Sequence, residues 1–318
     1  MLAALTMVTT AQASSWNFYG SARLETMSVD EDKGSGTSTK NTVWGQQSNA
    51  RIGAKVAVSD DLKARFEYGT KNGTANLRQL WGEGNFGPGK LLIGQTYTPI
   101  YTGYSSSVFD DGAALEGYGT ISASRKSMLQ LTFGDFKIAA IEPKTDKLTG
   151  TSTEVTIPKV EASYTFKFDN MSLKILGGYN SYEVDDTHDI DAYVLGVGAQ
   201  GSFGPDYLKA SAFTGQNLGT YGFKTNVDMD PTITGSSVQD NDNIGYVLVG
   251  GYKLNDMFKF EAGYGYIKGE LDGSQDDEAA HYYLQSKITL APGVYLVPEI
   301  GKRDEKQDNL GAEQGDTT

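Results

Sequence analysis

Seven short turn sequences, spaced along the whole chain, constrain the fold of this sequence more than any other feature. Each lies between two stretches in which polar and apolar residues alternate, and such turns are typical of β-hairpins. Long polar, acidic or Gly/Ser/Thr-rich segments join the other ends of the hairpins, which predicts an all-β fold with short turns at one end. The turns are Ser59-Asp60-Asp61, Gly87-Pro88-Gly89, Gly134-Asp135, Asp169-Asn170, Gly204-Pro205-Asp206, Asn255-Asp256 and Ala291-Pro292-Gly293.

The alternating stretches have one polar face and one apolar face. A soluble β-sandwich also needs one apolar face, but these stretches run for about nine residues or more, enough to cross a bilayer at a tilt, whereas strands of globular proteins usually have about five or six. Aromatic residues gather near the ends of the stretches, where the girdles of a membrane barrel would lie. The sequence therefore predicts a transmembrane antiparallel β-barrel. The girdle candidates are Tyr68, Phe166, Phe168, Phe258, Tyr264 and Tyr266.

Composition excludes several other classes of protein. The mean hydropathy is −0.39, and no apolar run reaches the roughly 18 residues of a membrane helix, a test that strands with one lipid-facing side escape. Cysteine is absent and the formal net charge is −13, which argues against disulfides, thiolate metal sites and nucleic-acid binding. The chain has two histidines, His188 and His281, and neither lies in a nucleophile motif. We therefore expect no enzymatic activity.

The two ends of the chain carry separate expectations. Residues 2–13 resemble the apolar part of a secretory signal, and Ala11-Gln12-Ala13 fits its cleavage rule. We therefore assign residues 1–13 to a partial signal peptide and 14–318 to a single barrel. The seven turns define fourteen strands, and Trp16 to about Val29 makes fifteen. Because such barrels have an even number of strands and 301–318 reads as a polar loop, we expect a sixteenth, closing strand that this sequence lacks.

Several segments, in this order, resemble the general porins of Gram-negative outer membranes. They are Phe18-Tyr19-Gly20-Ser21-Ala22-Arg23-Leu24, Asn49-Ala50-Arg51-Ile52-Gly53 through Leu62-Lys63-Ala64-Arg65-Phe66-Glu67, and Asn85-Phe86-Gly87 through Gly94-Gln95-Thr96-Tyr97-Thr98-Pro99. The resemblance implies a 16-stranded homotrimeric pore in the bacterial outer membrane, surrounded by lipid and lipopolysaccharide. Ions and small hydrophilic solutes would diffuse through it, and the loop at about 98–120 would fold inward.

Charged residues on the polar faces suggest how such a pore would select solutes. In the simplest register Arg23, Arg51, Arg65 and Arg78 face the lumen, and guanidinium groups stay charged at all relevant pH values. In the resembled family a cationic wall faces an acidic inserted loop. The resemblance thus assigns the four arginines to the wall, and Asp110, Asp111 and Glu116 to the loop, although the Pro-Glu-Phe-Gly-Gly type of segment at the loop tip is missing. The excess of acidic residues predicts a weak preference for cations.

Other interpretations remain open at this stage. The lumenal charges could be ordinary solvated lining, and the barrel could be a substrate-specific channel or a plugged structural or adhesion barrel. Asp185, Asp186, Asp189 and Asp191 could hold Ca²⁺, but the spacing of a calcium-binding loop is absent. A solvated loop is the favoured interpretation there, as it is for Asp240 to Asn243 and for Asp272 to Glu278. No other cofactor is expected.

Overall fold

The computed structural model describes residues 15–318 except 35 and 72, so the predicted signal peptide, residues 1–13, lies outside the described residues. In the described part, twenty strands form one sheet and β15 and β16 form a separate ribbon. No helix in that part is long and apolar enough to cross a membrane.

The strands are β1 (Ser15–Ser21), β2 (Leu24–Asp32), β3 (Ser38–Gln46), β4 (Arg51–Ala57), β5 (Leu62–Lys71), β6 (Thr74–Asn85), β7 (Lys90–Tyr97), β8 (Arg125–Phe133), β9 (Phe136–Ile141), β10 (Thr153–Glu154), β11 (Lys159–Lys167), β12 (Met171–Val184), β13 (His188–Phe203), β14 (Asp206–Gln216), β15 (Thr232–Thr234), β16 (Ser237–Gln239), β17 (Asn241–Lys253), β18 (Phe258–Leu271), β19 (Asp276–Ala291), β20 (Val294–Leu296), β21 (Glu299–Gln307) and β22 (Glu313–Thr317). The two short helices are α1 (Phe109–Gly112) and α2 (Leu218–Tyr221).

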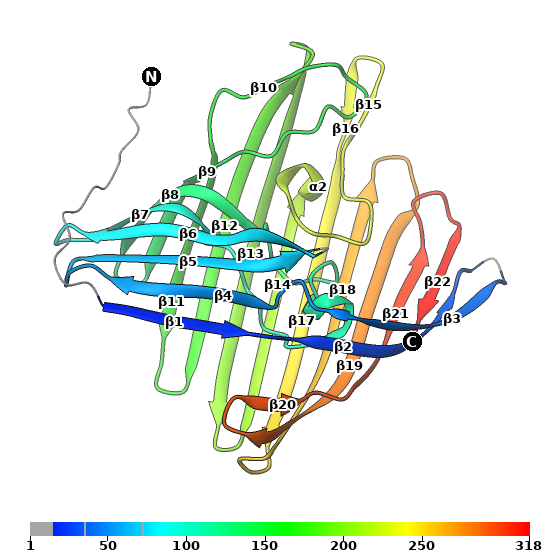
Figure 1. Cartoon of the computed structure of the whole chain (residues 1–318). Helices are drawn as coiled ribbons and strands as arrows, with labels where there is room; N and C mark the ends of the chain where they lie inside the picture. Colours follow the sequence, from blue (N-terminus) through cyan, green and yellow to red (C-terminus); the bar gives the residue numbers. More distant parts are fainter. Residues whose placement is uncertain (1–14, 35, 72) are drawn as a thin grey trace.

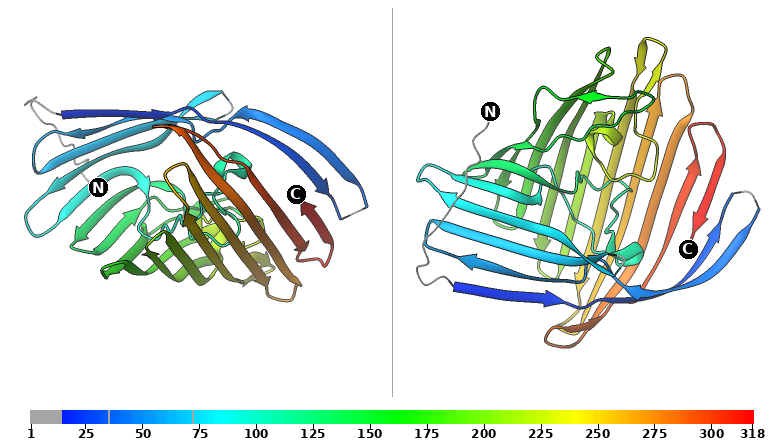
Figure 2. Two further views of the ribbon diagram at one scale, coloured as in Figure 1. Left: turned by 90° about the horizontal axis from the view of Figure 1, so that it is seen from below. Right: turned by 45° about the horizontal axis from the view of Figure 1, so that its top comes forward.

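The strand pairing runs around the molecule and returns to its start. Each long strand pairs antiparallel with the next, from β4 through β19 to β21. β22 then pairs with both β21 and β2, and β2 follows directly from β1, which pairs with β4. Figure 2 shows the sheet curving around an interior that holds part of the chain between β7 and β8. The fold is the predicted antiparallel β-barrel, and not two facing sheets.

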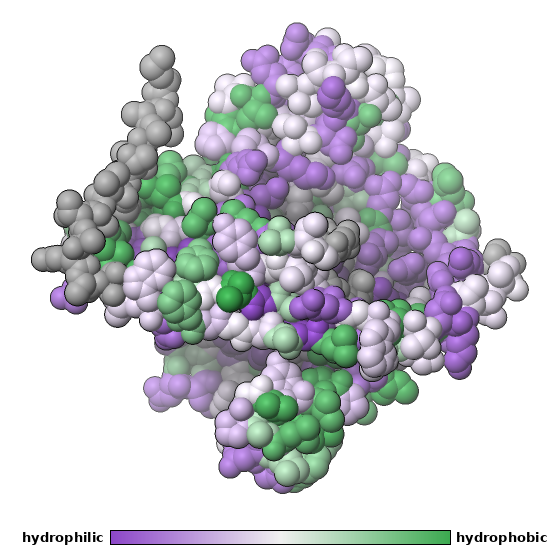
Figure 3. Space-filling model, in the orientation of Figure 1, coloured by the Kyte–Doolittle hydropathy of each residue, from purple (hydrophilic) through white to green (hydrophobic). Residues whose placement is uncertain are grey.

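The faces of the strands are inverted relative to a soluble protein. In β11, Val160, Tyr164 and Phe166 point outward and are exposed, whereas Lys159 and Glu161 point inward and are fully buried. An apolar outer face and a polar inner face are what a barrel in hydrocarbon requires. Figure 3 shows the hydrophilic upper lobe, where β15 and β16 lie, and apolar surface on the lower lobe near β20.

All seven predicted turns are confirmed as hairpin connections. They join β4–β5, β6–β7, β8–β9, β11–β12, β13–β14, β17–β18 and β19–β20. At the other end the long connections are 98–124, 142–158 and 217–240. Three segments predicted as solvated loops are partly strand instead: Asp189 and Asp191 belong to β13, Asn241 to Asn243 belong to β17, and Asp276 to Glu278 belong to β19. These long strands have polar residues on both faces near their ends, so hydrophobic alternation could not reveal them.

Two further predictions are corrected by the pairing. The expected strand from Trp16 to Val29 is divided at Ala22-Arg23 into β1 and β2, and β2 takes a different partner, β3. The expected polar loop at 301–318 is wrong, because it contains most of β21 and all of β22. Lys302, Asp304 and Lys306 give β21 a charged outer face. Its strand character therefore comes from backbone pairing with β19, which the sequence pattern does not display.

Candidate functional site

Three of the four predicted wall arginines converge on one buried carboxylate, Glu67 of β5. Arg78 Nε donates to Glu67 Oε1 at 2.7 Å, Arg65 Nη2 donates to Oε2 at 2.8 Å, and Arg51 Nη1 lies 3.6 Å from Oε1. The Glu67 side chain is completely buried, and Tyr19 also donates its hydroxyl to Oε2 at 2.8 Å. Three guanidinium groups around one carboxylate leave an excess of two positive charges on this wall.

A bulge in the β5–β6 ladder brings Arg78 to this cluster. Glu67 pairs with Gln79 but Tyr68 pairs with Leu77, so Arg78 is the extra residue of β6. A β-bulge re-aims side chains, and Arg78 and Gln79 are both buried here although they are neighbours in sequence. Arg23, the fourth predicted residue, stands at the break between β1 and β2. Its carbonyl accepts the Gln47 N–H at 3.0 Å, and no hydrogen bond joins it to Glu67.

The segment 98–124, between β7 and β8, lies along the inner wall and is held there by lumenal glutamates. Glu161 accepts the Ile100 N–H at 3.3 Å, and Glu261 accepts the Ser106 N–H at 2.9 Å. Glu299 accepts the N–H groups of Val108 and Phe109 at 2.9 and 3.0 Å. Because buried carboxylates bind backbone N–H groups strongly, these three side chains fix the path of the loop.

Lysines hold the carbonyl groups of the same segment. Lys174 Nζ donates to the Tyr101 carbonyl at 2.9 Å, and Lys209 Nζ donates to the Tyr104 carbonyl at 3.1 Å. Because the segment has no sheet partner of its own, these side chains satisfy backbone groups that would otherwise be unpaired inside the barrel. Gln47 Nε2 also holds the segment, because it donates to the Val108 carbonyl at 2.9 Å, beside the arginine wall.

The predicted acidic residues of this segment have different surroundings. The backbone of Asp110 and Asp111 lies in α1, but their side chains are outside the described part of the structure. Glu116 does not meet the arginine cluster: its Oε2 lies 3.9 Å from Lys224 Nζ and its Oε1 accepts from Ser122 Oγ at 3.3 Å.

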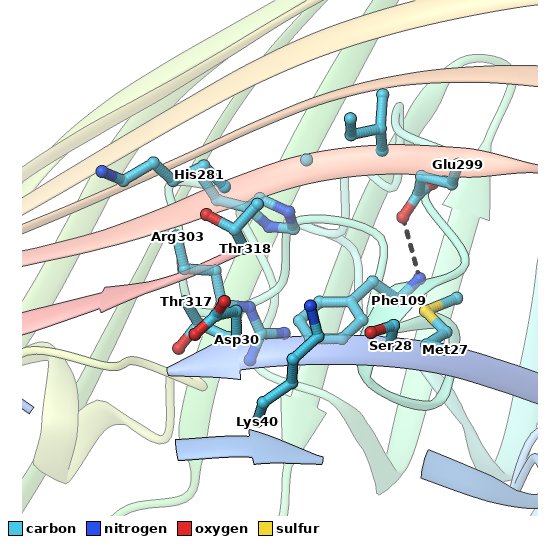
Figure 4. Close-up of a pocket in the computed structure, with 13 residues that line it drawn as sticks. Met27, Ser28, Asp30, Lys40, Phe109, His281, Glu299, Arg303, Thr317 and Thr318 are labelled. Atoms are coloured by element: carbon cyan, nitrogen blue, oxygen red, sulfur yellow. Dashed lines mark hydrogen bonds between the residues drawn. The ribbon is translucent and has the colours of Figure 1, made fainter. Parts of the chain in front are cut away.

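The first residue of α1, Phe109, packs against His281 of β19 and Arg303 of β21 (Figure 4). The guanidinium of Arg303 stands 4.5 Å from the centre of the Phe109 ring, and His281 meets that ring edge to face. A cavity of about 330 Å³ lies beside these groups, between β2, β21 and β22. Figure 4 shows Glu299 accepting the Phe109 N–H at the edge of this cavity.

A second inward segment, residues 217–231 with α2, was missed in the sequence analysis. Leu218 and Tyr221 are completely buried, and Met229 nearly so. Tyr221 donates its hydroxyl to Glu161 Oε1 at 3.0 Å, and Lys159 Nζ donates to the Tyr221 carbonyl at 3.2 Å. Burial and the nearby charge of Glu161 raise the pKa of Tyr221. The available signal was a set of apolar residues within a long connection that was otherwise polar.

The two inward segments meet inside the barrel. Gly117 and Thr225 form a β-bridge, and the Asn226 N–H donates to the Gly117 carbonyl at 3.3 Å. Apolar residues of both segments and of the inner wall form one buried cluster. Together the segments cover the wall from β11 to β21, opposite the arginine cluster on β4 to β6. The cluster contains Ile100, Tyr118, Ile121, Ala123, Leu176, Ala192, Val194, Phe213, Leu218, Tyr221, Phe223, Val227, Met229, Ile267 and Ala279.

Two of the four acidic residues considered as calcium ligands, Asp185 and Asp186, form a turn, and Asp185 also binds a neighbouring loop. Asp185 and Asp186 both have φ of 52°, as at the two central positions of a type I′ turn, and the Thr187 N–H closes this turn by donating to the Val184 carbonyl at 3.2 Å. The Asp185 carboxylate accepts hydrogen bonds from the N–H and hydroxyl groups of Thr151 and Ser152 at 2.8 to 3.1 Å. These bonds lower the pKa of Asp185 to about 2. Within the described ranges, no group of three His, Asp or Glu side chains is arranged to hold a metal ion.

Comparisons with known proteins agree with this architecture. The profile of a family described as Gram-negative porin matches residues 1–308. The outer membrane channel DcaP of Acinetobacter baumannii is similar in structure, with a TM-score of 0.78 at 17% identity over 98% of both chains. An anion-selective porin from Comamonas acidovorans has a TM-score of 0.66 at 15% identity, over 96% of this chain and 97% of that one.

A third similar structure is Salmonella typhi OmpF in complex with daunomycin. Its TM-score is 0.65 at 15% identity, over 95% of both chains. Comparison with curated protein sequences gives no match.

Replacing Glu67→Gln should destabilise the barrel, because three arginines would lose the carboxylate between them. Breaking a buried ion pair by removing one partner costs on the order of 3 kcal/mol. We expect a lower unfolding temperature, measured as the loss of heat-modifiable migration on a gel. Glu83→Gln on β6 is the matched control, since Glu83 is partly exposed and lies 3.7 Å from Lys90. Equal unfolding temperatures for the two variants would contradict the role given to Glu67.

Replacing Tyr221→Ala should release the second inward segment. Truncating a buried aromatic residue to alanine costs about 3 to 5 kcal/mol, whereas Tyr221→Phe loses only a hydrogen bond, about 1 kcal/mol. We expect larger and noisier single-channel currents for the alanine variant than for the phenylalanine variant. Identical currents for both variants would show that this segment does not narrow the lumen.

The Asp185 tether should depend on acid. Because the pKa of Asp185 is lowered in the folded state, its contribution is complete above the unfolded pKa of about 3.8 and is lost as the pH falls through about 2. Pepsin should therefore cleave the segment near Thr151 faster at pH 2 than at pH 4. Asp185→Asn, which keeps the turn conformation, should be cleaved at the faster rate at both pH values. Cleavage of the wild-type protein that does not depend on pH would contradict the tether.

Proposed function

This chain belongs to the Gram-negative porin family and is a channel of the bacterial outer membrane, and we propose that ions and small hydrophilic solutes diffuse passively through it. One observation supports this above all: charged side chains line the inside of the barrel while its outside is apolar. Lys55, Lys137 and Lys259 are exposed on the inner face, whereas Ile52, Leu195 and Leu248 are exposed on the outer face. A polar lumen of this kind carries water and solutes. Such transport needs no catalytic group.

The narrow part of the passage is proposed to lie between the arginine wall and the two inward segments. Arg51, Arg65 and Arg78 present two net positive charges after pairing with Glu67, and Arg23 stands beside them at the break between β1 and β2. Asp110, Asp111 and Glu116 are proposed as the acidic side of this passage. Fixed charges at the narrowest ring of a pore determine which solutes pass.

We also propose a homotrimer embedded in outer-membrane lipid and lipopolysaccharide. Support comes from the family and from the outer surface near the start of the chain, where Trp16 and Phe18 stack with ring centres 5.9 Å apart and remain exposed. An exposed apolar surface of this kind can face lipid or another copy of the chain.

A weak preference for cations is proposed from the net charge of −13. The acidic residues concentrate at the long-loop end, where they would attract cations into the mouth of the pore. The Comamonas acidovorans porin of similar fold is described as anion-selective, so the sign of the preference must come from the side chains of each chain.

A substrate-specific channel is the second candidate. The observation in its favour is the buried cluster formed by both inward segments, which would make the passage narrower than one inserted loop alone. Saturable block of the current by one class of solute would support this candidate. A fully plugged structural barrel would instead conduct nothing.

Planar-bilayer recording tests the proposal directly. We expect an open, ohmic conductance and, across a tenfold KCl gradient, a reversal potential of the sign for cation preference. The preference should weaken at high salt, because the screening length falls from about 10 Å at 0.1 M to about 3 Å at 1 M. A reversal potential of the opposite sign would refute the cation preference, and the absence of any current would refute passive diffusion.

A further inference from the structure

A belt of lysines surrounds the inside of the barrel at the short-turn end. Each belt residue lies close in sequence to a short turn and on the inner face of its strand. Lys259 alternates with buried Glu261, and Lys137 alternates with buried Ala139. This lysine belt consists of Lys55, Lys63, Lys137, Lys174, Lys209, Lys259 and Lys287.

The belt places like charges directly opposite one another. Lys259 of β18 pairs in register with Lys253 of β17 on one side and with Lys287 of β19 on the other. Like charges at directly opposed positions destabilise a sheet. Lys253 is neutralised by Asp256 at 2.7 Å. Within the described ranges, however, neither Lys259 nor Lys287 forms an ion pair with a carboxylate, so the row carries uncompensated charge.

Aromatic rings hold the ammonium groups in place. The Tyr207 ring lies 4.4 Å from Lys259 Nζ and 5.3 Å from Lys209 Nζ, and the Tyr295 ring lies 4.1 Å from Lys287 Nζ. Contacts of this kind orient a cation without removing its charge. The Tyr207 hydroxyl in turn donates to Glu261 at 2.6 Å, which fixes the ring.

The nearby carboxylates are largely engaged elsewhere. Glu261 accepts hydrogen bonds from Tyr207, Tyr283 and Ser106. At the turns, Asp135 pairs with Lys167 and Asp256 pairs with Lys253. Asp60, Asp61, Asp169 and Asp206 lie at the turn tips, beyond the belt. The belt therefore forms a positive zone between the inward loop and the rim.

The opposite end of the barrel is rich in carboxylates, and the lysines that the structure describes there are not arranged in a comparable row. Three lysines on the outer face near that end are paired with carboxylates: Lys268 with Glu270 and Asp276, Lys302 with Asp316, and Lys306 with Glu278. Further carboxylates there include Asp272, Asp277 and Asp308.

From this row of inward lysines without carboxylate partners we propose that the lysine belt binds small multivalent anions at the short-turn, periplasmic end of the lumen. The inference rests on the proposed function, because the belt must be open to solution. Several ammonium groups around one aqueous space attract an anion with two charges more strongly than chloride. The acidic mouth admits cations at the outer end, so the two ends of the channel differ in the ions that they concentrate.

The test is block of single-channel current by inorganic phosphate in 0.1 M KCl, with phosphate added to each side in turn. The chain has no cysteine, so Asp169→Cys at an exposed turn marks the periplasmic side through reaction with a membrane-impermeant thiol reagent. We expect block from that side at about one tenth of the phosphate concentration needed from the other. In 1 M KCl the difference should largely disappear.

Two triple variants identify the residues responsible. The belt variant Lys137→Gln, Lys259→Gln, Lys287→Gln changes exposed lysines that make no hydrogen bond to the inward loop, and it should abolish the difference between the sides. The control Lys268→Gln, Lys302→Gln, Lys306→Gln removes the same number of lysines from the outer face near the opposite end and should retain the difference. Equal block from both sides in the wild type, or unchanged block in the belt variant, would overturn this inference alone. The absence of any current would overturn the proposed function, and this inference with it.

Discussion

The requirement that every backbone N–H and C=O group be satisfied inside hydrocarbon governs this structure. A sheet comes close to meeting it when its ends curve round to meet, and here β22 pairs with β21 and, at Glu31 and Asp32, with β2. Once the sheet is curved in this way, the apolar residues must face outward and the polar residues inward. The inner wall then carries charged groups that a soluble protein of the same size would place on its surface.

The same requirement explains the inward segments. Their backbone enters the barrel without a strand partner, so side chains of the wall must take the place of a ladder. In the segment 98–124, backbone N–H groups donate to Glu161, Glu261 and Glu299, and backbone carbonyls accept from Lys174 and Lys209. These wall residues therefore have a structural task in addition to setting the field in the lumen. The charge left over for solutes is that of the arginine cluster and of the lysine belt.

The elements that could be predicted from sequence are those in which apolar and polar residues alternate. The seven turns and the strands beside them could be located, because there the outer face is apolar and the inner face polar. β21 and the outer ends of β12, β13 and β19 could not, because both faces are polar where the strands leave the hydrocarbon. Arg78 was assigned to the lumen from sequence, but it reaches Glu67 only through a bulge. The role of Glu161 as a partner of Tyr221 joins residues about sixty positions apart, a separation that no local pattern encodes.

The class of fold and the position of the turns follow from the sequence alone, since alternation with a period of two and turn chemistry are local properties. Which charged residues come together depends instead on the folded chain. It placed three arginines around Glu67, brought 217–231 into the barrel against 98–124, and aligned Lys253, Lys259 and Lys287 in one row. The physical reason is that register between strands and the path of a loop depend on partners distant in the chain. The net charge of a site is therefore set by all the charged side chains that these distant segments bring together.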